Sequence, residues 1–270
     1  MKNITSILLM SALGFSISCS TMKENTTKID DTAVLNNPFY KKSKLQYQAP
    51  EFDKIKDEHF APAFDYGLKV NEAEIAAIVN NKEAATFENT ILALEKSGEV
   101  LKRAQIVFYN LTGSNTNPTL QKIEEQYAPI FASHADKIYL NSALYNRIKA
   151  IKTDGLDAED QRLLEVYKQR FELAGANLSD SDKEQMKKIN AELATLSTQF
   201  SSKLLEARKK GAVLISDVKE LDGLSADEIA AAATDAKNAG YEGKYLLTLL
   251  NTTQQPLLQN LKNRATREKL

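Results

Sequence analysis

Apolar residues recur at steps of three and four through most of this chain of 270 residues, and this helical period restricts its fold more than any other feature. One such stripe runs from Phe87 to Leu111 for about seven turns, and another runs from Met186 to Ala207. Stripes of this kind mark helices that bury one face against other helices. Gly and Pro, at 10 and 6 residues, rarely interrupt the pattern. The sequence therefore predicts a mainly α-helical fold.

Capping residues and helix breakers indicate where the helices begin and end. The first helix is expected from about Phe60 to Asn80, with Pro62 in its first turn, where proline is tolerated. Gly175 and Gly211 are predicted to end two later helices. Side chains that can cap a helix N-terminus precede the other stripes. These predicted N-caps are Thr86, Asn117, Asn141 or Ser142, Asp157, Ser179 and Ser225.

Glycine and short apolar runs give three further expectations. Gly98 falls on the stripe of the helix predicted over 86–111, and we interpret it as a point of close approach inside one unbroken helix. Such a contact would offset the roughly 1 kcal/mol that glycine costs within a helix. Apolar runs at 212–216 and 245–250, bounded by Gly or Asp, predict two short β-strands. A last helix is expected from Pro256 onward.

The N-terminal segment has the pattern of a bacterial secretion signal. Lys2 precedes an apolar run from Ile4 to Ile17, which as a helix would rise about 21 Å and fall short of the roughly 30 Å core of a bilayer. Cys19, the only cysteine, follows small residues that resemble a lipoprotein cleavage box, although Ser16 stands where an aliphatic residue is usual. The alternatives for Cys19 are an unmodified thiol or removal with the signal peptide.

These features divide the chain into three expected parts. They are a signal peptide over 1–18, a lipidated flexible tether over 19–36 and a helical region over 37–270. Several acyl chains on Cys19 would hold the protein firmly at a membrane, because one chain alone binds only marginally. The expected location is the bacterial cell envelope, as a lipoprotein that faces the periplasm or the outer membrane.

Residues that could carry chemistry are few. The chain has two histidines, His59 and His134, and neither belongs to a His-Glu-x-x-His motif. His134 lies on an apolar stripe and is expected to be a buried, hydrogen-bonded structural residue, and His59 is expected on the surface of a first helical turn. Zinc requires three or four converging ligands, so we predict no zinc site and no catalytic residue in this chain. Basic and acidic residues balance at 35 and 36, without a basic block, so nucleic acid is not an expected partner.

A series of short motifs, each weak alone, occurs in a recognisable order from residue 37 to residue 270. Together they resemble the N-terminal part of the thimet-oligopeptidase-type zinc metallopeptidases, especially the bacterial peptidyl-dipeptidases and oligopeptidase A. Members of this family are almost wholly helical and more than twice as long. The motifs are Asn37–Phe39, Ala49–Asp53, Ile55–Phe64, Ala85–Thr90, Ala93–Gly98, Phe108–Leu111, Leu163–Gly175, Asn190–Phe200, Leu221–Leu224, Gly243–Leu249 and Asn263–Leu270.

The resemblance implies a zinc enzyme that releases C-terminal dipeptides from oligopeptides, with these helices as one wall of its substrate channel. The family's zinc motif comes well downstream of the position matched by Leu270, so the chain is expected to be truncated before the catalytic domain and inactive alone. Its expected partners are short peptides, a membrane through the lipid on Cys19, and the missing catalytic part of the same polypeptide. The alternative is a non-catalytic helical lipoprotein that binds peptides or acts as a scaffold.

Overall fold

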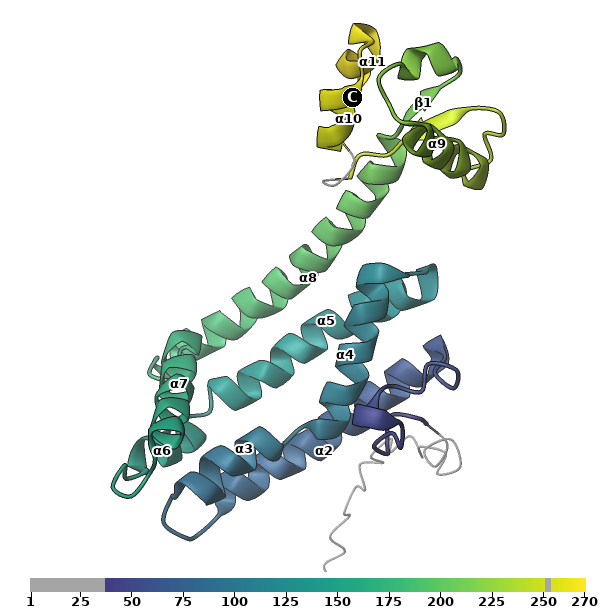
Figure 1. Ribbon diagram of the computed structural model, residues 1–270. Helices are drawn as coiled ribbons and strands as arrows, with labels where there is room; N and C mark the ends of the chain where they lie inside the picture. The colour runs from purple at the N-terminus through teal and green to yellow at the C-terminus, as the bar shows by residue number, and fades with distance from the viewer. Residues whose placement is uncertain (1–36, 251–253) are drawn as a thin grey trace, which may run out of the picture. The chain divides into compact units, whose positions relative to one another are not determined.

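A computed structural model of the protein describes residues 37–250 and 254–270 (Figure 1). The signal peptide, the tether and the lipidation site Cys19, all expected within 1–36, lie outside the described residues. Within the described ranges the chain is mainly α-helical and contains one two-stranded antiparallel sheet, which confirms the predicted fold class.

Most helices begin where the predicted caps stand. The side chains of Asn117, Asn141, Asp157, Ser179 and Ser225 each accept a hydrogen bond from a backbone N–H of the first turn. A π-helical segment over Phe87–Leu92 leads into α3. The helices are α2 (Phe60–Asn80), α3 (Ala93–Lys96), α4 (Glu99–Ser114), α5 (Pro118–Tyr139), α6 (Ser142–Ala150), α7 (Ala158–Ala174), α8 (Asp180–Lys210), α9 (Ala226–Asn238), α10 (Gln254–Asn260) and α11 (Arg264–Lys269).

Aromatic rings form the core between α2, α4 and α5. The ring of Phe64 is fully buried, and its centroid lies 5.2 Å from that of Phe108, 5.1 Å from Tyr127 and 4.9 Å from Phe131. Phe60 lies one turn before Phe64 on the same face of α2 and joins the same cluster. Edge-to-face pairs at these separations add about 0.5–1.5 kcal/mol each to the free energy gained by burial.

A second core joins the C-terminal half of α2 to α3, α6 and α7. Ile91, Leu144, Ile148 and Phe171 are fully buried there. Fully burying an aliphatic or aromatic side chain of this size contributes about 1.5–3 kcal/mol. Helix α2 contributes residues to both cores, so its position fixes how the surrounding helices are arranged.

The interpretation of Gly98 as part of one unbroken helix is wrong. Gly98 has a left-handed conformation, with φ of 72°, in the turn between α3 and α4. Its N–H donates a hydrogen bond to Glu74 Oε2 at 2.7 Å. The apolar period continues through this turn because both flanking helices pack on α2. The expected close approach at Gly98 is present, because an added Cβ there would lie 3.2 Å from the Asn71 side chain of α2. The helix backbones come closest at Gly67, where an added Cβ would lie 2.7 Å from Leu101 Cα.

The residues after α8 build a small core of their own. Strand β1 (Val213–Ile215) pairs antiparallel with β2 (Tyr245–Leu247), and both strands are shorter than the predicted 212–216 and 245–250. The single helix expected from Pro256 is instead α10 and α11. The chain breaks between them because Asn263 starts a new helix, where its side chain accepts a hydrogen bond from the Thr266 N–H.

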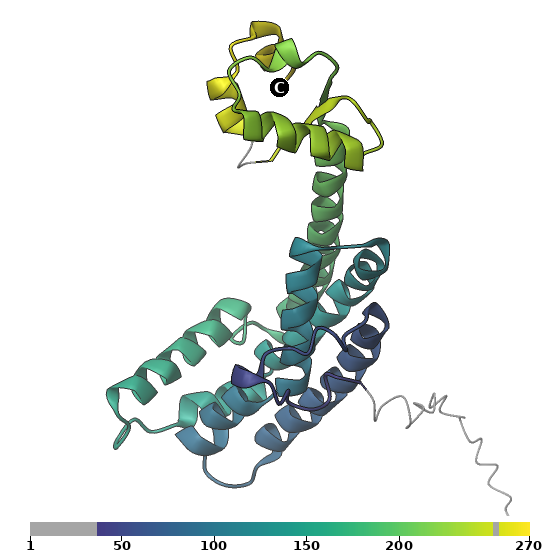
Figure 2. The ribbon, with the colours of Figure 1, turned by 45° about the vertical axis from the view of Figure 1, so that its right-hand side comes forward.

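Helix α8 runs antiparallel to α5 (Figures 1 and 2). Lys183 near the start of α8 donates a hydrogen bond to Ser142 just after α5, and Asn190 donates to Asp136 in the last turn of α5, at 2.7 Å. The half-buried side of α8 carries small and polar residues, among them Asn190, Ala194 and Thr198.

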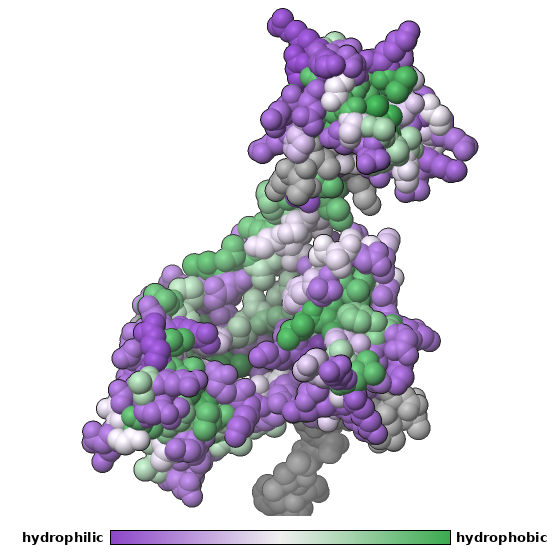
Figure 3. Space-filling model, in the orientation of Figure 1, coloured by the Kyte–Doolittle hydropathy of each residue, from purple (hydrophilic) through white to green (hydrophobic). Residues whose placement is uncertain are grey.

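The expectation that the apolar stripe of α8 is buried is wrong for the described residues. From Ile189 to Leu204 its large side chains are 42% to 67% exposed, whereas Met186 is half-buried. The reason is that α8 turns its small and polar side toward α5 and leaves its apolar side uncovered. Hydrophobic residues accordingly gather along α8 in the space-filling view (Figure 3). We call this set the α8 stripe; its members are Ile189, Leu193, Leu196, Phe200 and Leu204.

Candidate functional site

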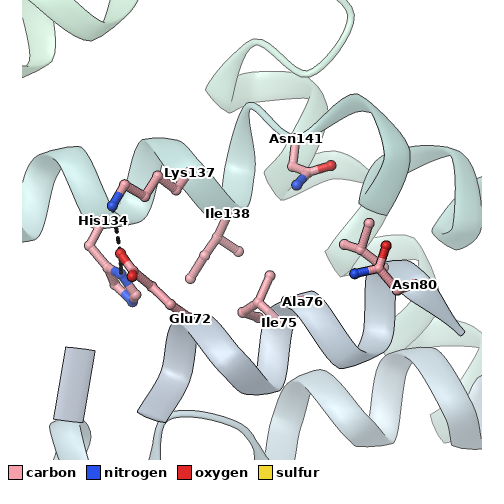
Figure 4. Close-up of a pocket in the computed structure, with 9 residues that line it drawn as sticks. Glu72, Ile75, Ala76, Asn80, His134, Lys137, Ile138 and Asn141 are labelled. Carbon is pink, nitrogen blue, oxygen red and sulfur yellow. Dashed lines mark hydrogen bonds and ion pairs between the residues drawn. The ribbon is translucent and has the colours of Figure 1, made fainter. Parts of the chain in front are cut away.

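A groove between α2 and the C-terminal half of α5 is the candidate site (Figure 4). It contains a cavity of about 320 Å³ and a neighbouring one of about 270 Å³. Glu72, His134 and Lys137 line both cavities, so the two lie next to each other along the groove. The larger cavity is also lined by Ile75, Ala76, Val79, Asn80, Ile138 and Asn141.

Helical spacing places these side chains on one face of each helix, and the packing of α2 on α5 brings the two faces together. From α2 come Glu72 and the residues three, four, seven and eight positions later, which share one face of a helix. From α5 come His134 and the residues three, four and seven positions later, the last of them Asn141 just after the helix. Two helices with matching faces therefore meet along their lengths, with Ile75 and Ile138 between them (Figure 4).

A charged pair spans the groove between the two helices. Lys137 Nζ lies 2.5 Å from Glu72 Oε1, and both side chains are about half exposed. Exposed ion pairs contribute only about 0–1 kcal/mol, so this contact orients the side chains more than it stabilises the fold. Asn80 and Asn141 lie toward the other end of the groove (Figure 4).

His134 is buried at the edge of the groove, with 7% of its surface exposed. Its Nε2 donates a hydrogen bond to Asn71 Oδ1 at 2.8 Å, since an amide oxygen can only accept. Its Nδ1 makes no hydrogen bond to the described residues and lies 3.9 Å from Glu72 Oε1. The prediction of a buried, hydrogen-bonded structural histidine is confirmed. Burial lowers the pKa of His134, and Lys137 lowers it further, while Glu72 opposes both.

A hydrogen-bonded chain connects this histidine to the turn before α4. Asn71 Nδ2 donates to Glu74 Oε2 at 3.4 Å, and the same oxygen accepts the Gly98 N–H. The sequence did not predict these linked hydrogen bonds, because Gly98 was expected inside a helix. Asn71 itself carried a usable signal, because it is a polar residue on the buried face of α2, between Phe64 and Ile75.

We expect the neutral state of His134 to make stability depend on pH. Because the folded pKa lies below the ordinary value, the stabilisation is complete above about pH 6.5 and declines as pH falls. His134→Gln keeps a donor for Asn71 and removes the titrating ring, so its free energy of unfolding should fall less than that of the wild type between pH 7 and pH 5. Urea unfolding at both pH values measures this difference.

His59→Gln serves as the control and should show the same decline in unfolding free energy as the wild type. If His134→Gln declined as much as the wild type, the neutral state of His134 would not be the cause of the pH dependence.

The other residues that the sequence singled out do not join the groove. His59 lies in the turn Asp57–His59, where its Nδ1 accepts the Lys56 N–H at 3.1 Å. Among the described residues, no group of three or more His, Cys, Asp or Glu side chains is placed to hold a metal ion. Within 37–250 and 254–270, no helix combines the length and apolar composition needed to cross a bilayer.

Comparison with known proteins relates the chain to peptidases. It is 48% identical over 238 residues to the dipeptidyl carboxypeptidase of Escherichia coli (strain K12), a match that covers 87% of this chain and 35% of the relative. It is 29% identical over 252 residues to the organellar oligopeptidase A of Arabidopsis thaliana, covering 90% of this chain and 31% of the relative. It is 27% identical over 229 residues to the oligopeptidase A of E. coli, covering 83% and 33%. No family model matches the chain.

The helical fold and these matches relate the chain to the peptidases as a class. It belongs to the thimet-oligopeptidase-type family, which includes dipeptidyl carboxypeptidase and oligopeptidase A, as its sequence motifs indicated. The chain spans about a third of the length of the curated relatives that it matches.

Proposed function

We propose that this chain is the N-terminal, substrate-channel part of a zinc peptidyl-dipeptidase that releases C-terminal dipeptides from oligopeptides. The observation that carries the proposal is the 48% identity to the E. coli dipeptidyl carboxypeptidase over 238 residues. A helical fold alone would not assign this function, because one fold serves many functions.

The α2–α5 groove supports contact with short peptides. It combines an apolar floor, formed in part by Ile75 and Ile138, with a few polar groups, a composition typical of ligand sites. The Asn80 amide can donate to and accept from a peptide backbone, and the Asn141 amide nitrogen can donate while its oxygen caps α6. Lys137 can pair with a peptide carboxylate in place of Glu72. We assign this groove to the channel wall of the full-length enzyme.

Zinc would supply the activated water in a full-length family member. Residues 37–250 and 254–270 bring together no set of zinc ligands, so these residues do not fit the metal and no chemical step is assigned to them. We propose that the ligands belong to a catalytic part in the rest of a longer polypeptide. We also propose a lipid anchor at Cys19 and a location in the cell envelope, and the mass of the mature protein will report on the modification.

A chimeric enzyme tests the proposed function. Residues 37–270 of this chain replace the matching region of the E. coli dipeptidyl carboxypeptidase, and dipeptide release from a short peptide is followed by chromatography. We expect the chimera to release dipeptides, and the E. coli enzyme with that region deleted to release none. We expect the 270-residue chain alone to bind no stoichiometric zinc and to release no dipeptides.

Two results would contradict this proposal. One is chelator-sensitive dipeptide release by the isolated chain with one bound zinc, because the ligands would then lie within it. The other is a folded but inactive chimera. Combined with peptide binding by the isolated chain, that second result would favour the alternative of a non-catalytic, peptide-binding lipoprotein.

A further inference from the structure

The α8 stripe is a regular apolar surface without a covering element among the described residues. Its members, from Ile189 to Leu204, follow one another at steps of four, three, four and four, so they occupy one side of the helix. Phe200 is 67% exposed and Leu193 is 60% exposed. Single exposed apolar residues are ordinary on protein surfaces, whereas a contiguous row of five marks an interaction site.

The opposite side of α8 is packed, so the exposure of the α8 stripe does not mean that the whole helix lacks neighbours. The half-buried side includes Asn190, Ala194 and Thr198, which are small or polar, and carries large apolar residues only toward its ends, at Met186 and Leu205. The chain therefore uses its less apolar side for the contact inside this unit and keeps its more apolar side open. An amphipathic helix normally buries the apolar side, so a second neighbour is missing from this arrangement.

The spacing and the flanking charges identify the kind of neighbour. Steps of three and four fit the ridges and grooves of another α-helix, with each side chain inserted between residues of its partner. The flanks carry charges of both signs, namely Lys188, Glu192, Lys203 and Glu206. A helix that binds a lipid surface carries mainly basic residues on its polar side, so the mixed charges favour a protein helix.

The length of the relatives indicates where that helix comes from. The matched region covers 35% of the E. coli dipeptidyl carboxypeptidase, so about two thirds of that protein lies outside it. We propose that the α8 stripe is the surface on which the rest of a full-length peptidase chain packs, through a helix with an apolar stripe of its own. This inference rests on the proposed function, since it takes the chain to be part of a longer enzyme.

A comparison of two molecular contexts tests the proposal. Phe200→Glu and Leu193→Glu are introduced both into the isolated 270-residue chain and into the full-length chimera described above. In the isolated chain both side chains already face solvent, so the melting temperature should change by no more than about 2 °C. In the chimera the same charge would be buried without a partner, and the melting temperature should fall by about 5 °C or more.

Leu173→Glu is the matched control. Leu173 is 79% exposed on α7 and lies outside the α8 stripe, so this substitution should leave the melting temperature of both proteins unchanged. If the chimera folds poorly, the substitutions are repeated at the aligned positions of the E. coli enzyme, which is a natural full-length chain. Equal melting temperatures of stripe variants and parent in that full-length chain would overturn the proposal.

Two further measurements test whether a second copy of the chain or a lipid surface covers the α8 stripe instead. Light scattering reports oligomeric state, and a full-length dimer that Phe200→Glu dissociates would overturn the proposal in favour of a second copy. Stripe-dependent binding to phosphatidylglycerol vesicles would overturn it in favour of a lipid surface.

Dipeptide release by the chimera distinguishes failure of this inference from failure of the proposed function. An active chimera in which the stripe substitutions have no effect on melting would contradict the inference alone. A folded, inactive chimera that the substitutions destabilise would support the packing surface and contradict the proposed function.

Discussion

Phe64→Ala is expected to lower the free energy of unfolding by about 3–5 kcal/mol, the range for an aromatic side chain removed from a packed core. Phe64 is fully buried, and its ring lies within about 5 Å of three other aromatic rings, those of Phe108, Tyr127 and Phe131. These rings come from α4 and α5, so the cavity left by alanine would open where three helices meet. Domains are stable by only about 5–15 kcal/mol, so this one change removes a large share of the total.

Urea unfolding followed by far-ultraviolet circular dichroism measures the effect. Phe52→Ala is the matched control, because Phe52 is 53% exposed and lies outside the aromatic cluster. Its substitution is expected to change stability by no more than about 0.5 kcal/mol. A loss below about 1 kcal/mol in Phe64→Ala would mean that the three helices do not share one packed core.

Local sequence signals predicted the helix boundaries well because their causes are local. Asn117, Asp157 and Ser179 cap helices with their own side chains, and Gly175 adopts the left-handed conformation that ends α7. Each of these interactions involves groups only a few positions apart in the chain. A sequence shows such groups directly, so the helices could be placed without knowledge of the tertiary structure.

Gly98 shows where periodicity alone fails. The apolar period passes through the turn at Gly98 without interruption, because the segments before and after it both pack on α2. Periodicity reports which residues face a neighbour and does not report whether the chain stays helical between them. The structure of the turn depends instead on Glu74, a residue of α2 that accepts the Gly98 N–H.

The candidate site was predictable only in part for a similar reason. The burial of His134 followed from its place on an apolar stripe, which the sequence shows. The groove itself depends on how α2 and α5 face each other, and Glu72 and Lys137 meet there although 65 positions separate them. For α8 the stripe was visible, but its exposure depends on which side of the helix packs on α5.

Gly67→Ala is expected to lower the free energy of unfolding by about 2 kcal/mol or more, as an overpacked core does. The new Cβ would lie 2.7 Å from Leu101 Cα and 2.8 Å from Leu101 N. Both are backbone atoms, so no side-chain rotation can relieve the contact, and α2 must move away from α4. The gain of about 1 kcal/mol that alanine brings to a helix interior is too small to offset this displacement.

Gly113→Ala provides the matched control, because an added Cβ at Gly113 in α4 would meet no atom within 4 Å. It receives the benefit in helix propensity without the clash and is expected to raise stability by up to about 1 kcal/mol. The two substitutions are chemically identical, so opposite signs in urea unfolding would isolate the contact between α2 and α4. Stabilisation by Gly67→Ala would contradict the close packing of these helices, and with it the position of α2 that both cores and the groove require.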